Sequence, residues 1–165
     1  MKYRQLITDV DGVLTNGCFT YSRQGKIYKQ FGPHDSDGFK ILKNEGISCI
    51  GVTADKRGFE ISKKRFDDLE IKLHLVKEMD RLNWLLKNVV PEETIFIGDG
   101  LYDIPCMKEC KISFAPKNAL DLTKKFASHV TNSSGGEGVI LEVALSILKD
   151  VNPEKYKKIS KGIFT

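Results

Sequence analysis

The sequence predicts an α/β protein built on a doubly wound parallel sheet, and two observations carry that prediction. Short apolar runs rich in β-branched residues alternate with segments whose apolar residues recur every three or four positions, the patterns of buried strands and amphipathic helices. Strands that alternate with helices form parallel sheets covered on both faces. The chain of 165 residues is also long enough for one domain with its own core, and short for two.

Each element of this fold is predicted from a short stretch of sequence. Five short apolar runs bounded by polar or turn residues are predicted to be strands: residues 6–10, 47–52, 73–76, 94–97 and 112–115. Apolar spacing of three and four predicts helices at residues 39–42 before Gly46, at 61–69, at 79–89 and at 139–148. This order of elements is that of a Rossmann-like fold.

One segment interrupts the alternation directly after the first strand. Two strand-like runs flank Ser-Arg-Gln-Gly, whose glycine suits a turn, so residues 18–31 are predicted to form a β-hairpin flap. The intervals between the polar motifs described below are too short to hold a cap domain. We therefore expect a single domain over residues 1–150, followed by a lysine-rich tail, residues 151–165, that is partly disordered.

Composition and charge exclude several classes of protein. Hydrophobic residues make up 41% and charged residues 29%, as in ordinary soluble globular proteins. The net charge of +4 is small and the basic residues are scattered, so the sequence gives no ground for nucleic-acid binding. No apolar run is long enough to span a membrane. The chain begins without a signal-peptide pattern and its four cysteines form no CxxC pair, so we expect a reducing, cytoplasmic location.

Polar side chains follow the carboxyl ends of four predicted strands. Ligands of doubly wound sheets bind at this edge, so these side chains are candidates for one site. They are Asp9 and Asp11 after the first strand, Thr53 after the second, Lys77 after the third, and Asp99 and Asp103 after the fourth. Because the third strand is polar and its placement can slip, Lys72 and Arg81 remain alternatives to Lys77.

These residue types in this arrangement indicate metal-dependent phosphoryl chemistry. Four carboxylates in one crevice repel one another unless a cation lies among them, and hard carboxylate oxygens suit Mg²⁺. Thr53 and Lys77 provide a hydrogen-bond donor and a positive charge for a phosphoryl group. Alternation along an extended strand sends Asp9 and Asp11 to the same side, where one carboxylate can attack phosphorus and the other can transfer protons.

These motifs, in this order, resemble the four motifs of the haloacid dehalogenase superfamily of phosphatases: DVDGVLT, the threonine after strand two, the lysine before a helix, and IGDGLYD. The hairpin, the spacing from Phe31 to Asp35 and the GGEGVILEV segment resemble the capless branch of that superfamily. That branch includes phosphatases of 3-deoxy-manno-octulosonate 8-phosphate and of nonulosonate 9-phosphates. The resemblance covers roughly residues 5–149.

The resemblance implies a role for each motif residue. Asp9 resembles the nucleophile of these phosphatases, and Asp11 resembles their general acid and base. The implied Mg²⁺ ligands are Asp9, the backbone carbonyl of Asp11 and Asp99, with Asp103 in support, and the implied phosphate-binding residues are Thr53 and Lys77.

The chain departs from the branch near the sugar part of the expected site. The departures are His34-Asp35-Ser36, Ala54-Asp55 and Leu141, where the branch usually has arginine or glycine residues. Three other basic side chains are candidates for contact with the substrate: His34, Lys56 and Arg65.

The resemblance also implies an assembly. Members of the branch close their open sites by forming tetramers through hairpins and C-terminal segments. The predicted hairpin carries apolar side chains that suit such an interface: Phe19, Tyr21, Ile27 and Tyr28. We therefore expect a homotetramer whose other partner is a small-molecule sugar phosphate.

The function that these expectations favour is a Mg²⁺-dependent phosphomonoesterase for a small sugar-acid phosphate. Two alternatives stay open: a phosphatase for another small sugar phosphate, and a non-catalytic assembly module of a cytidylyltransferase pathway. A signalling receiver domain also combines aspartate, Mg²⁺, threonine and lysine on such a sheet. Its phosphate-accepting aspartate ends strand three, whereas the third strand here ends in Val76-Lys77, which argues against that class.

Overall fold

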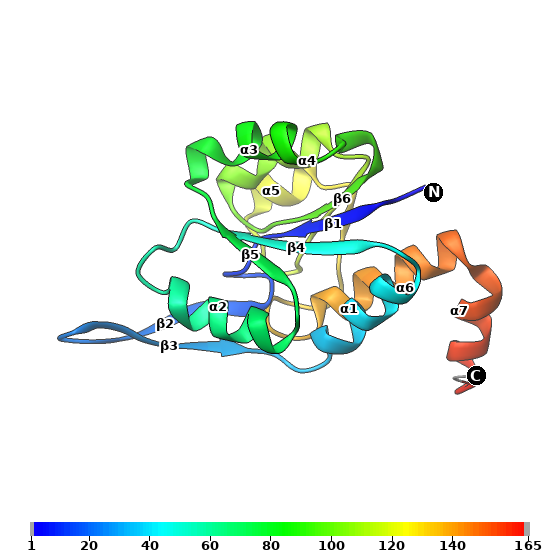
Figure 1. Ribbon diagram of the computed structural model, residues 1–165, viewed down its shortest axis with the longest axis horizontal. Helices are drawn as coiled ribbons and strands as arrows, with labels where there is room; N and C mark the ends of the chain where they lie inside the picture. The colour runs from blue at the N-terminus through cyan, green and yellow to red at the C-terminus, as the bar shows by residue number, and fades with distance from the viewer. Residues whose placement is uncertain (1, 164–165) are drawn as a thin grey trace.

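The computed structural model describes residues 2–163, in which six parallel strands form one sheet (Figure 1). The strands lie in the order β5-β4-β1-β6-β7-β8. Their bounds are β1 Gln5–Thr8, β4 Ser48–Thr53, β5 Lys72–Leu75, β6 Thr94–Ile97, β7 Ile112–Ala115 and β8 His129–Val130. The chain runs outward from β1 through β4 to β5, then outward on the other side from β6, so the strand order reverses beside β1. The predicted doubly wound parallel sheet is confirmed.

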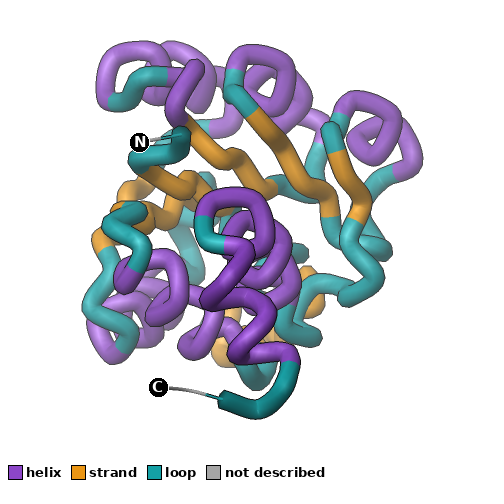
Figure 2. Tube along the Cα trace, turned by 90° about the vertical axis from the view of Figure 1, so that its right-hand side faces the viewer, coloured by secondary structure: helices purple, strands orange, loops and turns teal. Residues whose placement is uncertain are grey.

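Helices cover both faces of the sheet, and Figure 2 shows the strands between the two helical layers. Helices α1, α2 and α6 lie on one face, and α3, α4 and α5 lie on the other (Figure 1). The helices of the first layer are α1 Asp35–Asn44, α2 Phe59–Asp68 and α6 Val139–Val151. Those of the second layer are α3 Arg81–Asn88, α4 Ile104–Glu109 and α5 Asp121–Phe126.

Strand β1 lies between two hydrophobic cores, and its alternating side chains fill both. Leu6 packs in the core with Phe39 of α1, whereas the next residue, Ile7, packs in the opposite core with Leu85 of α3. Both β1 side chains are fully buried. Burial on both faces fixes the register of β1. This register determines the position of its carboxyl end, and so of Asp9 and Asp11, which follow it.

The hairpin is formed by β2 Thr15–Ser22 and β3 Gly25–Phe31, which are antiparallel. It begins three residues earlier than predicted and projects beyond the edge of the sheet (Figure 1). Its exposed side chains include Tyr21 and Tyr28. No cap domain is present among the described residues.

The C-terminal segment contains a helix, α7 Pro153–Ser160, where we expected partial disorder. The side chain of Asn152 caps this helix by accepting a hydrogen bond from the Lys155 N–H at 3.2 Å. The Lys155 ammonium lies 2.5 Å from Glu45 at the end of α1, which ties α7 to the body of the domain. Within residues 2–163, no helix has the length and apolar character needed to cross a membrane.

A buried carboxyl group joins α1 to α6. Asp35, the first residue of α1, is 2% exposed and accepts a hydrogen bond from the backbone N–H of Ile140 at 3.0 Å. Burial raises the pKa of Asp35 to about 7, although this hydrogen bond and the charge of Arg65 act in the opposite direction. The folded protein therefore binds a proton at Asp35 that the unfolded chain releases nearer its ordinary pKa of 3.8.

We predict a loss of stability as the pH rises, part of which depends on Asp35. Between the unfolded and folded pKa values the native state binds more protons than the unfolded chain, so the free energy of unfolding falls with rising pH. Asp35→Asn removes this titration. The fall in the free energy of unfolding between pH 5 and pH 8 should therefore be smaller in the variant than in the wild type, by at most about 3 kcal/mol. Urea unfolding at several pH values measures the effect. If the free energy of unfolding depended on pH in the same way in the wild type and in the variant, the prediction would be contradicted.

Candidate active site

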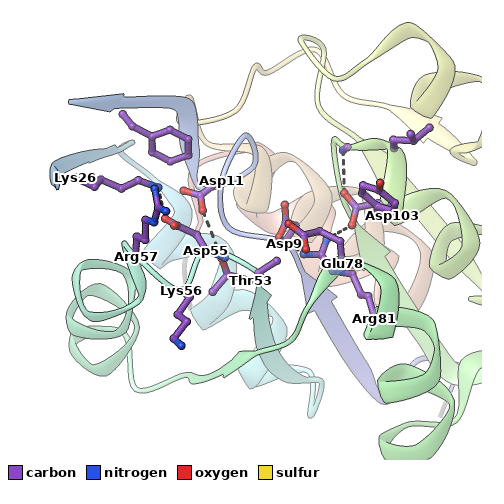
Figure 3. A pocket seen from close by; sticks show the side chains of 15 residues that line it. Asp9, Asp11, Lys26, Thr53, Asp55, Lys56, Arg57, Glu78, Arg81 and Asp103 are labelled. Carbon is purple, nitrogen blue, oxygen red and sulfur yellow. Dashed lines mark hydrogen bonds and ion pairs between the residues drawn. The ribbon is translucent and has the colours of Figure 1, made fainter. Parts of the chain in front are cut away.

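The carboxyl ends of β1, β4 and β6 meet around one cleft of about 480 Å³ (Figure 3). Asp9 follows β1 directly and stays in the sheet, because its N–H donates to the carbonyl of Ile97 at 2.9 Å. Asp11 and Thr53 line the same cleft. The structure thus brings together the side chains that the sequence predicts at the ends of the first and second strands.

A tight turn after Asp9 brings the loop that follows β1 close to Asp99, which follows β6. The backbone N–H groups of residues 13, 14 and 15 all lie within 3.3 Å of the carbonyl of Val10. Gly12 has a φ of +92°, and a Cβ atom there would lie 2.1 Å from a carboxylate oxygen of Asp99. Only glycine allows both this conformation and this approach, which explains the residue after the second aspartate.

Three carboxylates form the acidic centre of the site. Ligand oxygens of Asp9, Asp99 and Asp103 lie within 4.8 Å of one another. The pKa of Asp9 is raised well above its ordinary value, chiefly by burial, and repulsion from the neighbouring carboxylates adds to the effect while Arg81 opposes it. Burial, followed by repulsion from Asp103, raises the pKa of Asp99 to about 7. A divalent cation among these oxygens would relieve this repulsion, so the donor set suits one.

Asp103 serves the cluster differently from its two neighbours. One of its oxygens accepts hydrogen bonds from the backbone N–H groups of Asp99 and Gly100, at 3.0 and 2.9 Å. Its other oxygen accepts a hydrogen bond from Arg81. Because both oxygens already have partners, Asp103 orients the loop and the arginine, whereas Asp9 and Asp99 are the carboxylates of the cluster that could hold a metal.

Arg81 supplies the buried cation of the site. It is the first residue of α3, is 4% exposed, and places Nη2 3.1 Å from an oxygen of Asp9. Its Nη1 contacts Asp103, and its Nε is buried without a hydrogen-bond partner. Burial acts to lower the pKa of Arg81, but the carboxylates of Asp9 and Asp103 raise it above its ordinary value. The guanidinium therefore stays charged beside both carboxylates.

The structure does not bring Lys77 to the site. Strand β5 ends at Leu75, the next residue, Val76, is buried, and Lys77 is exposed and does not line the cleft. The N–H of Val76 donates to the carbonyl of Thr53, which fixes the direction in which the chain leaves the sheet. A 3-10 turn, Glu78–Asp80, then leads into α3, and Arg81 occupies the position expected for Lys77.

Thr53 and Asp11 contact each other at the opposite side of the cleft. The Thr53 hydroxyl is buried and donates to Oδ2 of Asp11 at 3.4 Å. The same Asp11 oxygen lies 2.8 Å from the ammonium of Lys29, a residue of the hairpin. The sequence indicated the threonine but not the lysine.

The outer wall of the cleft is basic. Lys26 of the hairpin, Lys56 and Arg57 line it together with Asp55 (Figure 3). Burial acts to raise the pKa of Asp55, but hydrogen bonds from Lys26 and Lys29 lower it to about 2. Asp55 therefore remains a carboxylate and holds the hairpin against the loop after β4.

Of the three basic side chains proposed to contact substrate, only Lys56 lines this cleft. His34 is exposed just before α1, and Arg65 lies in a separate depression beside Phe39. Arg57 also lines the cleft, and sequence reasoning missed it. It directly follows Lys56, so the adjacent pair of basic residues was the signal that could have identified it.

Comparison with known proteins agrees with this geometry. The sequence model of one protein family, the haloacid dehalogenase-like hydrolases, matches residues 81–143. The 3-deoxy-D-manno-octulosonate 8-phosphate phosphatase KdsC of Haemophilus influenzae is 34% identical over 149 residues, which cover 87% of this chain and 82% of the relative. The corresponding enzyme of Yersinia pestis is 34% identical over 151 residues, covering 88% of this chain and 79% of that protein.

The chain belongs to the haloacid dehalogenase-like hydrolases. Its relatives over most of the sequence are phosphatases, so the predicted superfamily and enzyme class are confirmed. The cobalt-bound structure of the Haemophilus influenzae phosphatase YrbI matches with a TM-score of 0.85 and 31% identity, and the match covers 98% of this chain and 96% of that one. A Moraxella catarrhalis phosphatase matches with a TM-score of 0.86 at 24% identity over 98% of this chain and 93% of that one, which shows the shared fold.

Arg81 should bind a phosphoryl group, and Lys77 should not. In Arg81→Met we expect the affinity for inorganic phosphate, measured by calorimetric titration with Mg²⁺ present, to fall about 10- to 100-fold, since hydrogen bonds to charged groups contribute about 1.5–3 kcal/mol. The variant should also unfold more easily, because it leaves two buried carboxylates without their cation. Lys77→Met, the matched control, should bind phosphate as the wild type does. A larger loss in Lys77→Met than in Arg81→Met would refute the assignment.

Proposed function

We propose that the chain is a Mg²⁺-dependent phosphomonoesterase that acts on the phosphate ester of a small acidic sugar. The substrate class is 3-deoxy-manno-octulosonate 8-phosphate or a nonulosonate 9-phosphate. The observation that carries the proposal is the position of Asp9, which belongs to an acidic cluster at the carboxyl edge of the sheet and contacts a buried guanidinium. This is the arrangement that an anionic phosphoryl group and its counter-cation require.

The residues that would hold Mg²⁺ are Asp9, Asp99 and the backbone carbonyl of Asp11, with Asp103 fixing the loop between them. The crowding and raised pKa values of the buried carboxylates support this assignment. Relatives also bind such ions: the YrbI structure contains cobalt, and the Moraxella catarrhalis structure contains magnesium, phosphate and a 3-deoxy-manno-octulosonate molecule. When bound, Mg²⁺ would neutralise charge on the phosphoryl group.

The side chains of the cleft then divide the reaction among them. Arg81 and Thr53 bind the non-reacting phosphoryl oxygens and hold phosphorus beside Asp9. A carboxylate oxygen of Asp9 attacks phosphorus to form an aspartyl-phosphate, while Asp11 protonates the departing sugar oxygen. Asp11 then removes a proton from the water that cleaves the aspartyl-phosphate, which regenerates the Asp9 carboxylate and the protonated form of Asp11 and releases phosphate.

The basic outer wall supports an acidic substrate. Lys26, Lys56 and Arg57 lie beyond the phosphoryl position, where the sugar of a phosphate ester would extend. The carboxylate of an octulosonate or nonulosonate would complement their charge. The relatives from Haemophilus influenzae and Yersinia pestis are 3-deoxy-D-manno-octulosonate 8-phosphate phosphatases, which supports the same substrate class. We accordingly place the reaction in the cytoplasm, in the synthesis of lipopolysaccharide or of sialic-acid-type sugars.

Phosphate release from a panel of substrates tests the proposal. The panel holds octulosonate 8-phosphate, nonulosonate 9-phosphates and hexose phosphates, each assayed with Mg²⁺ and with EDTA. We expect selective release from one acidic sugar phosphate, abolished by EDTA and reduced at least about 10⁴-fold in Asp9→Asn, because the nucleophile is lost. Equal activity on hexose phosphates would favour a different sugar phosphate. No release from any substrate would favour a non-catalytic assembly role.

We also propose that the chain assembles as a homotetramer through its hairpin. The side chains of Tyr21 and Tyr28 are 55% and 67% exposed, and that of Ile27 is 45% exposed, so one projecting element exposes three large hydrophobic side chains. Burying these side chains against another copy would remove that surface from water.

A charge on this surface should therefore disrupt the assembly. Tyr28→Glu is expected to convert tetramers into smaller species by light scattering after size-exclusion chromatography. Leu86→Glu, on the outer side of α3 and 49% exposed, is the matched control and should leave the assembly intact. A wild type that is monomeric at micromolar concentration would contradict the proposal.

A further inference from the structure

Lys29 of β3 is a buried charge at the junction of the hairpin and the sheet. Its side chain has no solvent exposure. Its ammonium lies 2.8 Å from a carboxylate oxygen of Asp11, 2.8 Å from one of Asp55, and 2.8 Å from the hydroxyl of Ser62. A lysine ammonium has three N–H donors, so all three of them have acceptors. The residue therefore joins β3 to the turn after β1, the loop after β4 and helix α2.

The charges around Lys29 balance within a small group, the hairpin cluster, formed by Lys26, Lys29, Asp11 and Asp55. Lys26 lies 2.5 Å from the same Asp55 oxygen and 3.4 Å from the centre of the Phe19 ring. Two ammonium groups therefore face two carboxylates where water is largely excluded. The balance of charge stabilises such a group, because an unpaired buried charge is costly.

Lys29 holds only one oxygen of Asp11. Oδ2 receives both contacts that the carboxylate makes, from Lys29 at 2.8 Å and from Thr53 at 3.4 Å. Oδ1 is buried and has no hydrogen-bond partner. One anchored oxygen and one unoccupied oxygen is the arrangement that a proton-transferring carboxylate needs, because the anchor sets the direction of the reactive atom.

We propose that Lys29 is the positioning residue for Asp11, fixing the orientation in which this carboxylate exchanges protons with the leaving group and with water. The proposal rests on the proposed phosphatase function. Without Lys29, Asp11 keeps only the long contact to Thr53, and two carboxylates face the single charge of Lys26. Repulsion would then turn Asp11 away from its working orientation.

A direct contact between Lys29 and the substrate does not fit the structure. Lys29 does not line the cleft, and its three donors are already used by the protein. Lys26, by contrast, lines the cleft and contacts Asp55 but not Asp11. The two lysines of one strand therefore have separable roles, and each serves as a control for the other.

The test combines kinetic constants with a double-mutant cycle on the full-length protein. In Lys29→Met we expect kcat for the preferred sugar phosphate to fall about 100-fold with KM changed less than about threefold, the loss expected from misplaced general acid-base catalysis. In the Asp11→Asn background, Lys29→Met should slow the reaction by less than about twofold, because its effect acts through Asp11. Losses that multiply in the double variant would overturn the proposal.

Lys26→Met is the matched control, since it removes an equal charge from the same cluster. Its effect should appear mainly in KM and should multiply with that of Asp11→Asn. The assignment to Lys29 would be overturned if Lys26→Met lowered kcat as much as Lys29→Met does and if neither substitution lowered kcat further in the Asp11→Asn background. General disturbance of the cluster would then explain both effects.

Lys29→Arg keeps the test decisive if the methionine variant does not fold. Arginine preserves the balance of charge, but its planar guanidinium cannot direct three donors as the ammonium does. We expect a folded protein whose kcat is about tenfold lower at unchanged KM, and a wild-type kcat would overturn the proposal. Activity of the wild type on the substrate panel tests the phosphatase function separately, so failure of one conclusion is distinguishable from failure of the other.

Discussion

Repulsion among crowded carboxylates is the constraint on which the rest of this structure depends. Asp9, Asp99 and Asp103 converge within 4.8 Å, and the side chain with the matching charge among the described residues is Arg81. Burial raises the pKa values of Asp9 and Asp99, and repulsion from the neighbouring carboxylates, which Arg81 balances only in part, adds to the effect. The imbalance is functional, since it favours a site that takes up a cation and then an anionic ester, and the sheet must be stable enough to maintain it. The two cores on either side of β1 provide that stability.

The part of the site that follows from strand ends was predictable from the sequence. Asp9, Asp11, Thr53, Asp99 and Asp103 lie where buried strands end, and short apolar runs mark those ends well. The strands at 94–97 and 112–115 have their predicted bounds. Helix α5 and strand β8 are not predicted by the sequence, because a six-residue helix with two apolar side chains and a two-residue strand are too short to carry a periodic signal.

Two pairs of basic residues show where sequence reasoning was insufficient. The sequence favours Lys77 over Arg81 because Lys77 comes first after the third strand, but a 3-10 turn intervenes and the first residue of the following helix, Arg81, reaches the site instead. Lys26 and Lys29 are three residues apart on one strand, so regular alternation places them on opposite faces. The hairpin register shifts between Lys26 and Tyr28, with Ile27 as the extra residue of β3, and both lysines reach Asp55. No feature of the sequence marks this bulge.

The hairpin therefore has two faces with different physical roles. Lys29 is buried against Asp11, and its neighbour Tyr28 is directed outward and is the most exposed aromatic residue of the hairpin. With the proposed role of Lys29, this strand would hold the general acid and base with one side chain and expose an apolar side chain, Tyr28, with the next. Contact of the outer face with another copy would limit the motion of β3, and through Lys29 the motion of Asp11. In a phosphatase without a cap domain, assembly and proton transfer would then depend on the same short strand.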